Sequence, residues 1–156
     1  SEKPDDSAKV TLQSGASFSG NVTPYATDWS SWDGVSKLYS TPDGMMLFGV
    51  LDNGTIVYDI FAAEQMSYEA AYSTVSEWEN VSELAVDPIS QERSCIFALT
   101  ESGVVLSSDA AAKEAVDGEA APYYEQGIMA DKIAAAGGYV YIIFDNDDYI
   151  SVQYSN

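Results

Sequence analysis

The sequence predicts an all-β protein of propeller-like repeats of antiparallel hairpins, with three units and an N-terminal hairpin. A shared pattern of strand and turn residues recurs along the chain. Its turn positions, Gly15, Gly54, Gly103 and Asp148, are separated by 39, 49 and 45 residues. A unit of about 40 to 50 residues has the length of a propeller blade. A β-trefoil, which uses three units of about this length, is the alternative.

Each predicted unit combines a leading strand with a strand–turn–strand hairpin. The sequence Asp52-Asn53-Gly54 is a strong hairpin signal, because Asn and Gly accept a positive φ between two β-rich runs. We expect the leading strands and hairpins at 32–38 with 47–57, at 78–84 with 96–106, at 130–133 with 141–150, and a further hairpin at 10–18.

The chain divides into a short lead-in and one domain. Residues 1–8 are polar and charged, and we expect a flexible N-terminal lead-in there, followed by a single all-β repeat domain over residues 9–156. The inter-unit segments 61–77 and 107–127 are rich in Ala and Glu, and fit loops, short helical turns or a fourth strand. We expect one helix from Ala110, stopped by Gly118 and Pro122.

The repeat pattern resembles a known family of propellers. A tryptophan, a Val-x-x-Leu/Ile run, a strand ending in Leu and a turn ending in Gly before a Val/Ile-rich strand resemble the regulator-of-chromosome-condensation type of β-propeller repeat, over residues 9–155. The segment Ala136-Gly137-Gly138-Tyr139 lacks the histidine common in that family, and the family's seven blades exceed the units present here. The resemblance implies a binding scaffold and leaves the ligand open.

The small number of units raises the question of how the fold closes. A propeller needs about four blades or more. The two chain ends are expected to share strands and so complete a small ring. The alternatives are a longer protein, or a homo-oligomer in which two copies share blades.

The charge balance excludes several partners. The chain carries 25 acidic and 6 basic residues and no histidine, which gives a formal charge of −19. Binding to nucleic acid or to an anionic membrane needs clustered Lys and Arg, so neither is expected. No run reaches the roughly 20 apolar residues that span a bilayer, so no membrane insertion is expected. No signal peptide is visible in the sequence, so any targeting segment has been removed or never existed. We expect an extracellular or cell-surface location.

The chemistry of the chain argues against an enzyme. Without histidine no Ser/His/Asp or Cys/His set exists, and Cys95 lies alone in an apolar run that predicts a core position. A pair of carboxylates acting as a hydrolase is the alternative.

An acidic cluster is the one candidate metal site. Asp145, Asp147 and Asp148 offer oxygen ligands of the kind that Ca²⁺ prefers. The EF-hand pattern fails, because Tyr149 and Ile150 occupy its fifth and sixth positions. A tight turn explains the cluster without a metal, so we expect no cofactor, with calcium as the alternative.

Aromatic side chains are the candidate ligand-binding residues. Trp29 and Trp32 lie in a Ser/Asp-rich segment, and Tyr123 and Tyr124 follow Pro122 between two units. Flat rings stack on sugars or bind protein partners. The other interpretation places Trp32 in the core, because Trp78 occupies the equivalent repeat position.

Two further tyrosines, Tyr139 and Tyr141, lie within one predicted strand, and we expect at least one of them to pack in the core. From the whole sequence we expect a non-enzymatic binding module. It would recognise a protein partner through its inter-repeat loops, because loops on a rigid frame are free to vary. A carbohydrate is the alternative ligand.

Overall fold

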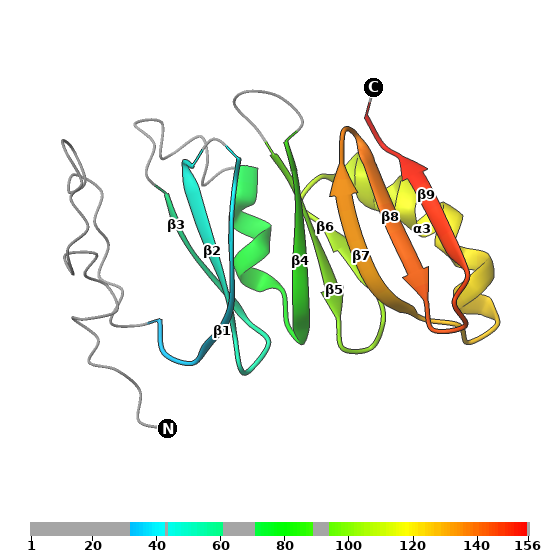
Figure 1. The fold of residues 1–156 in the computed structure, drawn as a ribbon, viewed down its shortest axis with the longest axis horizontal. Helices are drawn as coiled ribbons and strands as arrows, with labels where there is room; N and C mark the ends of the chain where they lie inside the picture. Colours follow the sequence, from blue (N-terminus) through cyan, green and yellow to red (C-terminus); the bar gives the residue numbers. More distant parts are fainter. Residues whose placement is uncertain (1–31, 43, 61–70, 89–93, 156) are drawn as a thin grey trace.

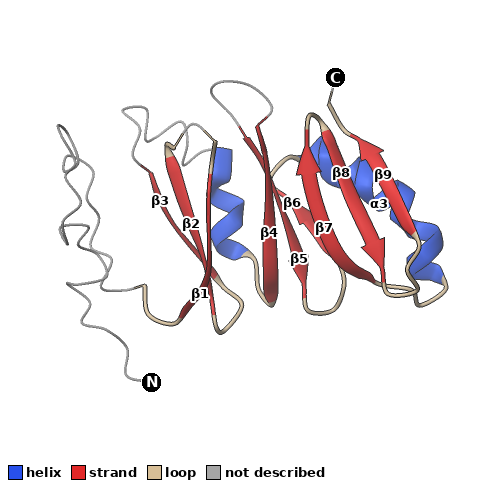
Figure 2. Ribbon diagram, in the orientation of Figure 1, coloured by secondary structure: helices blue, strands red, loops and turns tan. Residues whose placement is uncertain are grey.

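The protein is mostly β. The computed structural model describes residues 32–42, 44–60, 71–88 and 94–155, and within them nine strands form three antiparallel three-stranded sheets (Figures 1 and 2). The prediction of an all-β fold is confirmed, and the three sheets repeat the same consecutive strand order. The predicted lead-in at 1–8 and hairpin at 10–18 lie outside the described residues.

Each sheet is a simple meander in chain order. Sheet A comprises β1 (Val35–Ser40), β2 (Met46–Leu51) and β3 (Ile56–Ile60). Sheet B comprises β4 (Val81–Pro88), β5 (Ser94–Thr100) and β6 (Val105–Ser107). Sheet C comprises β7 (Ala130–Ala136), β8 (Tyr139–Phe144) and β9 (Tyr149–Gln153). The 3₁₀ helix η2 (Ser73–Glu77) precedes sheet B, and the helix α3 (Ala110–Glu125) precedes sheet C.

The core lies in two parts, one on each side of sheet B. One part packs sheet A and η2 against sheet B, and the other packs sheet B against α3 and sheet C. Every residue of β5 is buried, because apolar layers cover both sides of this central strand. The three sheets therefore follow one another along the long axis of the molecule, as Figure 1 shows.

The hairpin turns repeat in detail. The N–H of Leu51, Thr100 and Phe144 donates to the carbonyl four residues later in each turn, at 2.8–2.9 Å. The turn residue with positive φ is Gly54, Gly103 and then Asp147, not the predicted Asp148. The third turn contains no glycine to mark its register, and aspartate tolerates the left-handed conformation better than most residues do.

Backbone hydrogen bonds join each turn to the next unit. Val81 N–H donates to Gly54 O at 2.8 Å, and Ala130 N–H donates to Gly103 O at 3.0 Å. A Cβ on Gly54 would lie 2.8 Å from Asn80 Cα, and glycine is required here because the next strand begins against the turn.

The helix α3 is longer than predicted. Asp109 caps it by accepting the N–H of Ala112 at 2.9 Å, and it continues through Gly118 and Pro122 to Glu125. The prediction that these two residues end the helix is wrong. Their intrinsic costs, about 1 and 3 kcal/mol, are offset by burial of the apolar side of α3 between sheets B and C.

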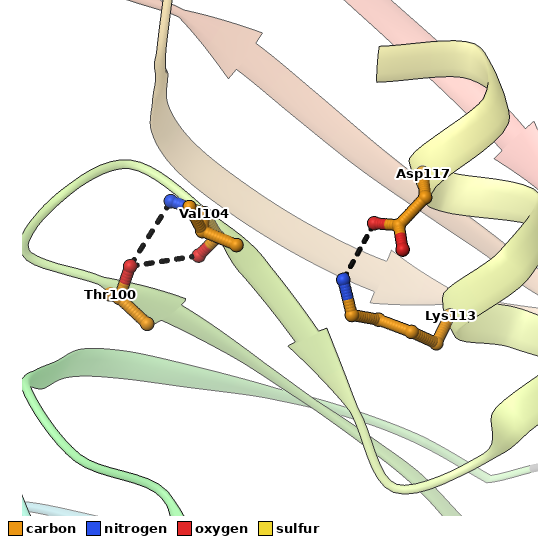
Figure 3. A network of polar contacts seen from close by, with 4 residues as sticks. All are labelled: Thr100, Val104, Lys113 and Asp117. Atoms are coloured by element: carbon orange, nitrogen blue, oxygen red, sulfur yellow. Dashed lines mark hydrogen bonds and ion pairs between the residues drawn. The ribbon is translucent and has the colours of Figure 1, made fainter. Parts of the chain in front are cut away.

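Two local contacts support this region, and Figure 3 shows both. In the β5–β6 turn, the hydroxyl of Thr100 accepts the N–H of Val104 at 3.1 Å and donates to its carbonyl at 3.2 Å. On α3, Lys113 and Asp117 form an ion pair of 2.6 Å one helical turn apart. In the part of the chain that the structure describes, no helix has the length and apolar character needed to span a membrane.

Candidate binding face

Sheet C has one covered side and one open side. In β8, Val140, Ile142 and Phe144 are buried against α3 and sheet B. Tyr139 and Tyr141 alternate with them and therefore point to the opposite side, because successive side chains of a strand alternate in direction. Neither ring joins the core, so the expectation that one of them would pack there is wrong. Residues two apart lie on the same side of a strand, so Tyr139 and Tyr141 share one side, and the core is formed by the residues on the other side.

The open side of sheet C corresponds to sides that are covered in the first two units. Aligned on the three turns, Tyr141 occupies the position of Phe48 and Phe97, and its exposed fraction is 43% where both phenylalanines have 0%. Tyr149 occupies the position of Ile56 and Val105 and is 76% exposed, against 5% and 1%. The surface that each preceding unit buries under its successor is thus left uncovered in the third unit.

We call this surface the tyrosine face. Strand register places nine residues on it: Lys132, Ala134, Ala136, Tyr139, Tyr141, Ile143, Tyr149, Ser151 and Gln153. The rings of Tyr139 and Tyr141 are nearly parallel, with centroids 6.2 Å apart and an interplanar angle of 19°. Tyrosine combines a flat apolar ring with a hydroxyl that donates and accepts hydrogen bonds, which suits a surface that is wet when empty and dry when bound.

Carboxylates gather at one end of the tyrosine face. Asp131 lies next to the first register pair of β7 and β8, Ala130 with Phe144, and the β8–β9 turn supplies Asp145, Asp147 and Asp148. All four aspartates are exposed, and we call them the acidic end. Asp131 pairs with Lys132 at 3.1 Å, so four carboxylates and one ammonium leave a charge of −3 there.

A buried carboxylate attaches sheet C to sheet B. Asp87, at the end of β4, is fully buried, and its Oδ2 accepts the N–H of Gly138 at 2.7 Å and the hydroxyl of Tyr154. Burial, and next the bond to Asp87, raise the pKa of Tyr154 well above its usual range. The tyrosine stays a neutral donor, and this link holds the β7–β8 turn in place.

Cys95 is a core residue. It is fully buried beside Ser107, and burial raises the pKa of its thiol from 9.0 to about 11. A thiol with this pKa is protonated at neutral pH and a poor nucleophile.

Of the candidate ligand-binding aromatics singled out from the sequence, Trp32, Tyr123 and Tyr124 lie away from the tyrosine face. Trp32 is 8% exposed and packs over Gly49, and Trp29 lies outside the described residues. Tyr123 stacks flat on Phe144, with ring centroids 3.9 Å apart, and Tyr124 meets the same ring edge-on at 6.4 Å. Both tyrosines pack against the second part of the core.

The acidic cluster singled out for calcium forms a hydrogen-bonded turn. Asn146 accepts the N–H of Asp148 and donates to its carboxylate, both at 3.0 Å, and Asp145 accepts the N–H of Met129 at 3.4 Å. Among the described residues, no three carboxylate or thiol side chains group closely enough to hold a metal ion.

Sequence reasoning missed the tyrosine face. A signal was present in the aligned repeats. Tyr139 stands where the first two units have Met46 and Cys95, and Tyr141 and Tyr149 likewise stand at positions that those units fill with other apolar residues. Reading it required the register of the third turn. Comparisons with protein-family models, with curated proteins and with solved structures found no match to this chain.

Proposed function

We propose that this protein is a non-enzymatic binding module that recognises a protein partner through the tyrosine face. The observation that carries the proposal is the exposure of Tyr141 and Tyr149 at positions that the first two units bury. Soluble proteins seldom leave a contiguous apolar surface uncovered without a use for it, and such surfaces mark interaction sites.

The composition of the tyrosine face favours a protein over a sugar. Ile143, Ala134 and Ala136 lie among the tyrosines, and aliphatic side chains offer a sugar little hydrogen bonding. Tyrosine is enriched among the residues that carry most of the energy at protein interfaces, because its large ring loses little conformational freedom on binding.

A sheet face serves recognition better here than the segment between the second and third units does. The segment between the second and third units forms α3, and its buried residues Ala112, Val116 and Ala120 belong to the core. This packing limits which side chains α3 can carry. The tyrosine face borders no other described element on its open side, so its side chains are not limited in this way.

A propeller-like arrangement of the units is part of the proposal. The first strands of successive sheets contact one another, β1 with β4 and β4 with β7. The outer strands β6 and β9 are in contact with α3, which separates them. Blades set around an axis have this wedge-shaped spacing. The resemblance to regulator-of-chromosome-condensation repeats and the extracellular location stay predictions.

The test compares three versions of the protein as affinity baits in extracts of the source cells. The double variant Tyr141→Ser/Tyr149→Ser alters the tyrosine face, and Glu114→Ser/Glu119→Ser alters exposed positions of α3 as the matched control. We expect wild type and control to retain a protein that the face variant does not. When the purified protein is titrated, its Kd for the face variant should be roughly tenfold higher than its Kd for wild type.

Two outcomes would contradict the proposal. One is a set of retained proteins that is the same for all three baits. The other is face-dependent binding to a glycan array without a face-dependent protein, which would make the carbohydrate the ligand.

A further inference from the structure

We infer that the partner of the tyrosine face is a basic protein, which lays apolar side chains on the tyrosines and places Lys or Arg against the acidic end. This inference rests on the proposed function and specifies the partner's chemistry. It follows from the charges around the face and from the exclusion of a further repeat unit as the occupant.

The charges around the tyrosine face select a cationic partner. The face itself carries one charged side chain, Lys132, and its ammonium is paired with Asp131 at 3.1 Å. The neighbouring turn adds three exposed aspartates, and the whole chain has a formal charge of −19. Such a field attracts a basic protein over a distance and repels an acidic one.

Tyrosine also suits cations at close range. A Lys or Arg side chain over the face of a tyrosine ring is attracted by the ring's quadrupole. Tyr149 is the first residue of β9 and lies at the end of the tyrosine face next to the β8–β9 turn, so a cation over this ring is near the turn that supplies three of the four carboxylates. An apolar residue of the partner then has Ile143 and Tyr141 beside it on the same face.

A further repeat unit does not fit on this face in the geometry of the first two junctions. There the turn residue is glycine, and a Cβ on Gly103 would lie 2.5 Å from Met129 Cβ. The third turn has Asp147 at this position with a φ of 71°, so its side chain occupies the space in which a next unit would begin. Asp147 therefore blocks continuation of the stack, whether by a further unit or by a second copy.

Like charge also opposes a second copy. Two chains of −19 meeting through their tyrosine faces would place eight aspartates around the edges of one interface. Such juxtaposed like charges weaken association, most strongly at low ionic strength. Together the steric and the electrostatic observations favour a different protein, of opposite charge, as the occupant.

The experiment selects ligands from a displayed library of random peptides of about 16 residues. Wild type is compared with three purified variants that are shown to fold by urea unfolding. Tyr141→Ser/Tyr149→Ser alters the face and Asp145→Asn/Asp148→Asn neutralises part of the acidic end. Glu114→Gln/Glu119→Gln removes the same charge from α3 as the matched control.

We expect the selected peptides to combine Lys or Arg with aromatic or aliphatic residues. Their Kd should rise roughly tenfold for the face variant and roughly fivefold for the acidic-end variant, and stay unchanged for the control. Raising the salt from about 50 to about 300 mM should weaken the binding to wild type.

The remaining outcomes separate the inference from the proposed function. Face-dependent peptides without excess basic residues would overturn the inference and leave the proposed function standing. Basic peptides that bind the face variant as well as wild type, selected beside face-dependent peptides that are not basic, would also overturn the inference, because net charge alone would explain the basic ones. A selection without face-dependent peptides would contradict both. A wild-type dimer in sedimentation that the face variant abolishes would make a second copy the occupant.

Discussion

Gly103 and Ala130 form a backbone bridge between the second and third units, in which the carbonyl of Gly103 accepts the N–H of Ala130 at 3.0 Å. The bridge between Gly54 and Val81 repeats it at 2.8 Å. Backbone atoms make both bonds, so any residue could form them. A residue other than glycine is excluded because its Cβ would clash with the start of the next unit. At both junctions the glycine leaves the space in which the next unit begins against the turn.

Replacing the junction glycine should loosen the third unit. We expect Gly103→Ala to lower the free energy of unfolding by about 2–4 kcal/mol, from about 1–2 for the left-handed backbone and the rest for the displaced unit. The control is Gly127→Ala, which has a φ of 75° but nothing within 4 Å of a Cβ, and should cost about 1 kcal/mol. Equal losses in urea unfolding would show that no close approach exists at Gly103.

A pair of substitutions tests the register of the third turn. Asp147→Gly relieves a left-handed aspartate with φ 71° and should stabilise the protein by about 1 kcal/mol. Asp148→Gly removes the same charge, but it also removes the carboxylate that accepts a hydrogen bond from Asn146 and should destabilise the protein. Thermal unfolding of both variants distinguishes them, and the reverse order would place the turn residue at 148.

The open side of sheet C predicts an asymmetry between equivalent positions. Val105→Ala empties a site that is 1% exposed and should cost about 1–3 kcal/mol. Tyr149→Ala acts at the aligned position, 76% exposed, and should cost about 0.5 kcal/mol or less. Urea unfolding measures both. A large loss for Tyr149→Ala would mean that the tyrosine face is covered in the free protein.

The buried thiol predicts a loss of stability at alkaline pH. Burial raises the pKa of Cys95 to about 11, so between 9.0 and 11 the unfolded chain releases a proton that the folded chain keeps. Stability supplied by the neutral thiol is complete below pH 9 and falls as the pH rises, by roughly 2–3 kcal/mol in all.

The matched variant for this effect is Cys95→Ala. Its free energy of unfolding should fall less than that of wild type between pH 8.5 and 10, below the range in which the tyrosines dominate. Parallel curves for the two proteins would contradict the raised pKa.

Local sequence signals predicted those features that depend on few residues. Asp52-Asn53-Gly54 predicted its turn because Asn and Gly satisfy a positive φ wherever they occur between strands. The equivalent Asp147 was missed by one residue, because a run of three aspartates and an asparagine offers several registers of similar local energy. The end of α3 was misplaced for a related reason. Local propensity opposes Gly118 and Pro122, and the burial that outweighs it is made by other parts of the chain.

The sequence by itself determined the strands, the repeat and the charge, since alternation, turn residues and carboxylates are properties of short segments. Only the tertiary structure decided which side of each strand is covered. Tyr123 and Tyr124 pack against the core, whereas Tyr141 and Tyr149 lie on an open face, although all four are the same residue type. The physical reason is that a strand offers two sides of equal standing, and stacking against a neighbouring unit buries only one of them.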